Sequence, residues 1–114
     1  MAAVDRQGRV ADFSSRGGSR HPDKPDVAAP GVNIYSGTAR ASLVDAGDPQ
    51  AGFGYAAISG TSMATPHIAG LLALLKHRTP SLTESDFKAV LRNQGGPFNT
   101  ATGWGVPKWS WFLI

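Results

Sequence analysis

A serine that follows a glycine and opens an apolar run could do chemistry in this sequence. Gly60, Thr61 and Ser62 come after a strand-like stretch and directly before that run. A helix N-terminus offers unpaired N–H groups and about half a positive charge. A hydroxyl placed there can attack a carbonyl carbon while the serine's own N–H faces the oxyanion that forms. Gly60 leaves room for a substrate backbone. The pattern is therefore compatible with Ser62 as a nucleophile.

A simpler interpretation needs no chemistry. Serine and threonine are common N-cap residues, so Ser62 or Thr61 could serve only to satisfy the first backbone N–H groups of the helix. The two interpretations differ in where the hydroxyl points, and the spacing alone leaves both open.

None of the three histidines is placed to act as the base for Ser62. His67 comes five residues later on the same predicted helix, about 140° around it, and His77 lies about 22 Å along it. His21 precedes Pro22 in a loop, and no motif supports it as a base. A serine without a base is a weak nucleophile.

Two helices are expected to position this serine. The first runs from Thr61 or Ser62 to about Arg78; its apolar residues cover most of the circumference, and Pro66 falls in its first turns. The second begins after Pro80 with Thr83 as N-cap and stops at the Gly-Gly-Pro of 95–97. Short strands are predicted at 2–4, 9–13, 26–29, 33–36 and 55–58. The connection of 37–54 shows no period, which is typical of a functional or mobile loop.

Composition describes one globular domain or part of one. The chain has 114 residues, 41% hydrophobic and 17% charged, with a net charge of +3. Its basic residues are scattered, which argues against nucleic acid as a partner. The absence of cysteine excludes disulfides and thiolate zinc sites. The apolar run 68–75 falls short of the ~20 residues of a membrane span, and the first residues do not resemble a signal peptide. The apolar end 109–114 is expected to dock on the core.

Eleven consecutive residues, Gly60 to Gly70, resemble the nucleophile motif of the subtilisin-like serine proteases. Three flanking segments agree in order. Residues 10–17 resemble the family's strand running into Phe-Ser-Ser, 24–31 its Asp-x-x-Ala-Pro-Gly turn, and 103–106 its Gly-aromatic-Gly turn. Residues 1–114 are therefore interpreted as the C-terminal part of a subtilisin-like peptidase domain.

The resemblance implies an α/β fold of three layers with a mainly parallel sheet, here short strands followed by two helices. It implies that Ser62 is the acyl-forming nucleophile and that its backbone N–H is half of the oxyanion hole, supported by Thr61. The groove beside the scissile bond would be lined by Ile58, Ser59 and Gly60. No cofactor is implied. A weak cation site at Asp26 and calcium in a complete domain are left open.

The other members of the family's triad are missing from these residues. The triad runs Asp, His, Ser along the chain, and neither an Asp-Ser/Thr-Gly nor a His-Gly-Thr motif occurs. Asp45 in Asp-Ala-Gly is too close to the serine, and Asn33 lies past the place of the oxyanion asparagine. The chain alone is therefore expected to be inactive.

Two functions remain open on the sequence. The first is a serine endopeptidase that takes peptide or protein substrates and pairs with a missing N-terminal half. The second is a degenerate, non-catalytic remnant or peptide-binding module. No nucleic acid or membrane partner is expected, and the resemblance favours an extracellular or periplasmic location. Without the N-terminal half, apolar faces at 10–13, Val27 and 68–75 are expected to be partly uncovered, so that the free chain would associate or be marginally stable.

Overall fold

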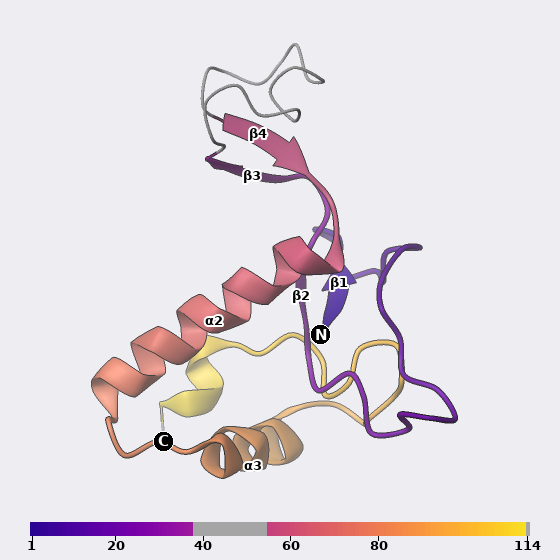
Figure 1. Cartoon of the computed structure of the whole chain (residues 1–114). Coiled ribbons are helices and arrows are strands. Elements are labelled where there is room, and N and C mark those ends of the chain that lie inside the picture. Colours follow the sequence, from indigo (N-terminus) through magenta and orange to yellow (C-terminus); the bar gives the residue numbers. More distant parts are fainter. Residues whose placement is uncertain (38–54, 114) are drawn as a thin grey trace.

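The computed structural model describes residues 1–37 and 55–113, so the predicted connection after Gly37 lies outside the described residues. Figure 1 shows the elements in chain order. They are β1 (Ala2–Val4), β2 (Ala28–Pro30), β3 (Ile34–Gly37), β4 (Tyr55–Ile58), α2 (Thr61–Arg78), α3 (Glu84–Gln94) and the 3₁₀ helix η1 (Trp109–Phe112).

Strands β1 and β2 form a short parallel pair. Strand β1 pairs with β2, with Ala2 opposite Ala28 and Val4 opposite Pro30. All three residues of β1 are buried, and both alanines are fully inaccessible. Helix α2 packs against both strands, and the small alanine side chains allow this close approach. The parallel pair therefore fixes the position of the helix that carries Ser62.

The other pair is antiparallel and projects from the rest of the chain near the start of α2 (Figure 1). Strand β3 pairs with β4, with Ile34 opposite Ile58 and Gly37 opposite Tyr55. Asn33 has a φ of 52°, in the left-handed region that ends regular strand geometry. This explains why β3 begins at Ile34 rather than at the predicted residue 33.

Both predicted helices are present. Helix α2 begins at Thr61 and ends at Arg78, and it continues through Pro66. Helix α3 begins after Thr83, whose hydroxyl accepts a hydrogen bond from the backbone N–H of Asp86. The Asp86 carboxylate accepts one from the backbone N–H of Thr83, which completes a capping box.

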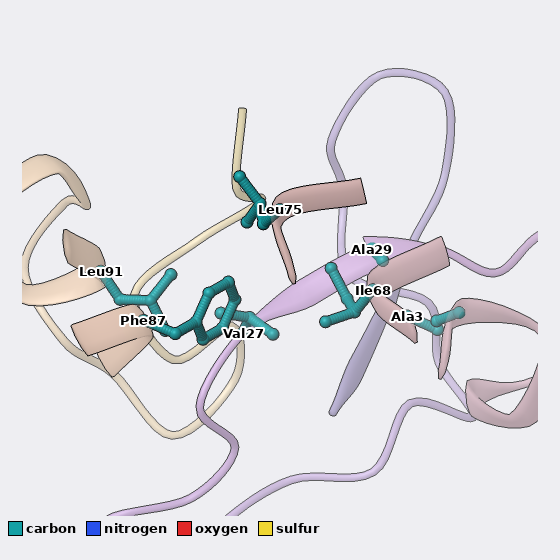
Figure 2. Close-up of a cluster of buried hydrophobic side chains, with 8 residues drawn as sticks. Ala3, Val27, Ala29, Ile68, Leu75, Phe87 and Leu91 are labelled. Carbon is teal, nitrogen blue, oxygen red and sulfur yellow. The ribbon is translucent and has the colours of Figure 1, made fainter. Parts of the chain in front are cut away.

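The core lies where the parallel strands, α2 and α3 meet. Figure 2 shows Val27 and Ile68 side by side, with Phe87 and Leu91 of α3 approaching from one side. The C-terminal segment closes this end, because the Phe112 ring of η1 stacks on Phe87 with centroids 5.3 Å apart. The predicted docking of the apolar end is confirmed for Trp111 and Phe112, which pack against the core, whereas Trp109 and Leu113 are exposed and residue 114 lies outside the described residues.

The strand predicted at 9–13 is wrong. Only Val10 forms a bridge, to Val4, and the chain then turns at Asp12 and Phe13. The N–H of Ala3, which a neighbouring strand would use, instead donates to Ser14 Oγ at 2.9 Å. The Ser14 side chain thus accepts from the backbone N–H that a longer strand at 9–13 would need as a donor.

The expected exposure of apolar faces is found only in part. Phe13 is 50% exposed and Leu74 is 60% exposed, as expected. Val27, in contrast, is buried at 3%, so that expectation is wrong. Strand β2 also starts two residues later than predicted, and Val27 immediately before it packs among the core residues of α2 and α3.

Candidate active site

Ser62 is the second residue of α2, and its side chain is exposed. The N-cap of this helix is Gly60, and no side chain caps it. Neither Thr61 nor Ser62 therefore serves as N-cap, which contradicts the simpler interpretation of the sequence. The serine hydroxyl stands at the N-terminal end of a helix, as the nucleophile interpretation requires.

Several backbone N–H groups lie in the turn beside this hydroxyl, and only some of them are already hydrogen-bonded. The N–H groups of Met63 and Ala64 both reach the carbonyl oxygen of Gly60, at 3.0 and 3.3 Å. Within residues 1–37 and 55–113, no acceptor pairs with the N–H of Thr61 or Ser62. These donors, together with the helix dipole, make the turn a favourable place for a developing negative charge.

The turn before Ser62 rests on the chain that leaves β2. The N–H of Gly60 donates to the carbonyl oxygen of Gly31 at 2.8 Å, and the N–H of Gly31 donates to Val4 at 3.0 Å. A Cβ added to Gly31 would lie 2.6 Å from the Cβ of Ala3 and 2.7 Å from the oxygen of Gly60. Close approach of Ala3 and of the Gly60 carbonyl thus requires a glycine at position 31.

Thr61 faces the segment that follows the 12–13 turn. Its Oγ1 accepts a hydrogen bond from the N–H of Ser15 at 3.1 Å, and the neighbouring Ser14 is buried and holds β1. The predicted oxyanion support by Thr61 is therefore accompanied by a structural contact. Sequence reasoning missed the role of Ser15, since only the fold brings residues 15 and 61 together.

Ser59 joins the two strands of the hairpin where they leave the core. Its Oγ accepts a hydrogen bond from the N–H of Asn33 at 2.8 Å. Ser59 is exposed, and Ile58 beside it is 39% exposed. The contact with Asn33 orients the chain that leads into Gly60.

A groove begins at Ser62 and extends along the hairpin. Its volume is about 440 Å³, and its lining is made of residues from β3, the end of β4 and the first turns of α2: Ile34, Tyr35, Ser36, Gly37, Ile58, Ser62, Met63, Pro66 and His67. The structure thus brings the predicted Ile58 and Ser62 together, whereas the predicted Ser59 and Gly60 are not among the described residues that line this groove. The residues of β3 were missed, and the register of β3 against β4 is what adds them to the groove.

His67 also lines this groove, but it is engaged with its own helix. Its Nδ1 lies 3.0 Å from the carbonyl oxygen of Met63. His77 lies in the last turn of α2, and His21 forms a backbone bridge with Gly18. None of the three is held against Ser62 by a hydrogen bond in the described part of the chain.

Asp26 is engaged by a cation of the protein itself. Its carboxylate lies 2.9 Å from the ammonium of Lys24. Among the described residues, no group of three histidine, aspartate or glutamate side chains could hold a metal ion. A cation role for Asp26 stays a prediction. In the same part of the chain, no helix is both long enough and apolar enough to span a membrane.

Comparison with known proteins assigns the family. A sequence model of the Subtilase family matches residues 1–105. The chain is 44% identical over 87 residues to the minor extracellular protease Vpr of Bacillus subtilis, covering 75% of this chain and 10% of that protein. It is 39% identical over 107 residues to a thermostable alkaline protease of Halalkalibacterium halodurans, covering 94% of this chain and 23% of that protein.

A solved structure supports the fold assignment. The CspB protease of Clostridium perfringens superposes with a TM-score of 0.72 at 26% identity, covering 98% of this chain and 25% of that one. The chain spans about a tenth to a quarter of the length of these relatives. Its α/β architecture is that of a part of the subtilisin-like fold, and the chain belongs to the Subtilase family of serine proteases.

Proposed function

We propose that these residues form the C-terminal part of the catalytic domain of a subtilisin-like serine endopeptidase, in which Ser62 is the nucleophile. The observation that carries this proposal is the exposed Ser62 hydroxyl on the first turn of α2, next to backbone donors without an acceptor in the described residues. The family assignment supports it, because this position falls in the segment matched by the family model.

The reaction is acyl transfer to water. Ser62 Oγ bonds to the carbonyl carbon of the scissile peptide, its proton passes through a base to the peptide nitrogen, and the C–N bond breaks to release the amine and leave an ester on Ser62. The carbonyl oxygen, which becomes negatively charged, accepts a hydrogen bond from the N–H of Ser62. Water then attacks the ester, which returns the proton to Ser62 and releases the carboxylic acid.

The neighbouring residues have supporting roles in this proposal. Thr61 Oγ1 already accepts from Ser15, so its own hydroxyl proton is left to support the oxyanion. A Cβ at Gly60 would stand 3.2 Å from Sδ of Met63 and 3.7 Å from the N of Ser62, so glycine leaves more room for a substrate beside that N–H. Ile58 lines the groove, and Ser59 holds the chain just before the turn through its contact with Asn33.

The base and its aspartate come from the N-terminal part of the domain, which we propose as the structural partner of these residues. The exposed face of α2 supports this. It is apolar and made of small residues around one large one, namely Pro66, Ala69, Gly70, Ala73 and Leu74. Such a face is typical of a helix that is covered by close neighbours. A secreted location is part of the proposal, as one relative is named an extracellular protease. No cofactor is needed for the chemistry.

The test uses the complete domain and a protein substrate such as casein. Ser62→Ala should abolish turnover without changing the melting temperature, since the side chain is exposed. Ser85→Ala is the matched control, because Ser85 is also the exposed second residue of a helix, α3. Residues 1–114 alone should not turn over casein. A complete domain that binds peptides without cleaving them would instead identify a non-catalytic peptide-binding module.

A further inference from the structure

We propose that Tyr35 is a specificity-determining residue that receives an aromatic or large aliphatic side chain of the substrate close to the scissile bond. This inference rests on the proposed function of Ser62. Tyr35 and Ser62 line the same groove, although they lie on different elements, β3 and α2. A peptide attacked at Ser62 would place the side chain of a nearby residue in this groove.

The groove is suited to an uncharged side chain. Its walls include Ile34, Ile58, Met63 and Pro66, and among residues 1–37 and 55–113 no Asp, Glu, Lys or Arg lines it. A charged side chain would lose water there without gaining an ionic partner from these walls. An apolar side chain would instead bury surface against apolar walls.

Tyr35 is held in place by a second tyrosine. Its ring stacks on Tyr55 of β4, with centroids 5.6 Å apart and planes 16° from parallel. The residue opposite Tyr35 is Ala57, and the residue opposite Tyr55 is Gly37. Both are small, so each ring can lean across the hairpin to meet the other.

The stacked pair is exposed to solvent, with Tyr35 64% and Tyr55 52% accessible. A large side chain that is fixed by a neighbour binds a ligand with little further loss of conformational freedom. Tyr35 therefore offers a preformed apolar surface, and Tyr55 is the positioning residue behind it. Figure 1 shows the hairpin that carries them extending from the start of α2.

The experiment compares cleavage by the complete domain of peptide pairs that differ only in Phe, Leu or Ala at each position around the scissile bond. In Tyr35→Thr, which retains a strand-forming residue, the kcat/KM ratio of Phe over Ala should fall about 3- to 10-fold at one position. Tyr35→Phe should keep the ratio. Tyr55→Leu should lower it less, mainly through KM. Trp109→Ala is the control, since Trp109 is an exposed aromatic that does not line the groove.

A second measurement separates this inference from the proposed function. A fluorophosphonate reports reactivity at Ser62, and calorimetry on the Ser62→Ala domain reports peptide binding without turnover. Labelling of Ser62 together with an unchanged Phe-to-Ala ratio in Tyr35→Thr would overturn the role of Tyr35 and leave the function standing. If Ser62 is not labelled but the Phe peptide binds in a manner that depends on Tyr35, the proposed function of Ser62 is overturned and the binding role of Tyr35 stands.

Discussion

The backbone N–H of Gly60 lies 2.8 Å from the carbonyl oxygen of Gly31, and this hydrogen bond joins the turn before Ser62 to the end of β2. Gly31 in turn donates to Val4 of β1. The turn that carries the serine is therefore tied to the buried parallel pair.

Gly31→Ala tests this relationship in the complete domain. The added Cβ would meet the Cβ of Ala3 at 2.6 Å and the oxygen of Gly60 at 2.7 Å, so the turn must shift. Overpacking of this kind costs about 1–3 kcal/mol, and we expect a lower melting temperature with kcat reduced more than KM is changed. Gly18→Ala is the control, since an added Cβ there meets nothing within 4 Å. Equal kcat values in the two variants would contradict the role of Gly31.

Gly70→Ala tests whether another part of the domain covers α2. Within the described residues, a Cβ at Gly70 meets nothing within 4 Å, so helix propensity alone would stabilise the protein by roughly 1 kcal/mol. A close neighbour from the N-terminal part of the domain would clash with the added Cβ and make the substitution destabilising. We therefore expect Gly70→Ala to lower the stability of the complete domain in urea. Ala89→Gly, at an exposed site of α3, calibrates the propensity effect. A stabilised Gly70→Ala domain would show that this face remains open.

Thr61 is expected to combine two roles that substitution can separate. Thr61→Val removes the acceptor for the N–H of Ser15, which should cost about 1 kcal/mol of stability and also lower kcat through the lost hydroxyl. Thr61→Ser keeps both interactions and should behave like the wild type. Equilibrium unfolding and casein turnover give the two readouts. An unchanged kcat in Thr61→Val would leave Thr61 with the structural role alone.

The capping box of α3 predicts a defined pH dependence. Hydrogen bonds from the backbone N–H and then the hydroxyl of Thr83 lower the pKa of Asp86. Because the folded pKa lies below the ordinary aspartate value of ~3.9, this stabilisation is complete above about pH 5 and is lost as the pH falls through the folded pKa. Asp86→Asn should therefore be less stable than the wild type at pH 7, and the gap should close in acid. For Ser85→Ala, the difference in stability from the wild type should not change with pH. A pH-independent difference for Asp86→Asn would contradict the role of the Asp86 carboxylate in the capping box.

Local patterns predicted the two helices well. The start of α2 at Thr61 follows from a glycine before an apolar run, and the Thr83 cap of α3 from its acidic first turn. The boundaries of short strands were less predictable. The segment 9–13 has strand composition, but Ser14 takes the N–H of Ala3 that a longer strand would need.

The site was predictable where it depends on one segment and not where it depends on pairing. The motif predicted Ser62 and Ile58, which line one groove, and the catalytic role of Ser62 stays a prediction. The register of β3 against β4 brings Tyr35 into the same groove, and the sequence spacing of 27 residues gives no sign of it. The support of Thr61 by Ser15 is a contact across 46 residues and is likewise a property of the fold.

The most direct test of the account is the site at which a fluorophosphonate modifies the complete domain, mapped by peptide mass spectrometry. We expect a single adduct on Ser62 and none on Ser85, although both are exposed second residues of helices. The adduct should disappear when the domain is unfolded before labelling. A folded, soluble domain that leaves Ser62 unmodified, or that carries equal label on Ser85, would contradict the assignment of Ser62 as the nucleophile.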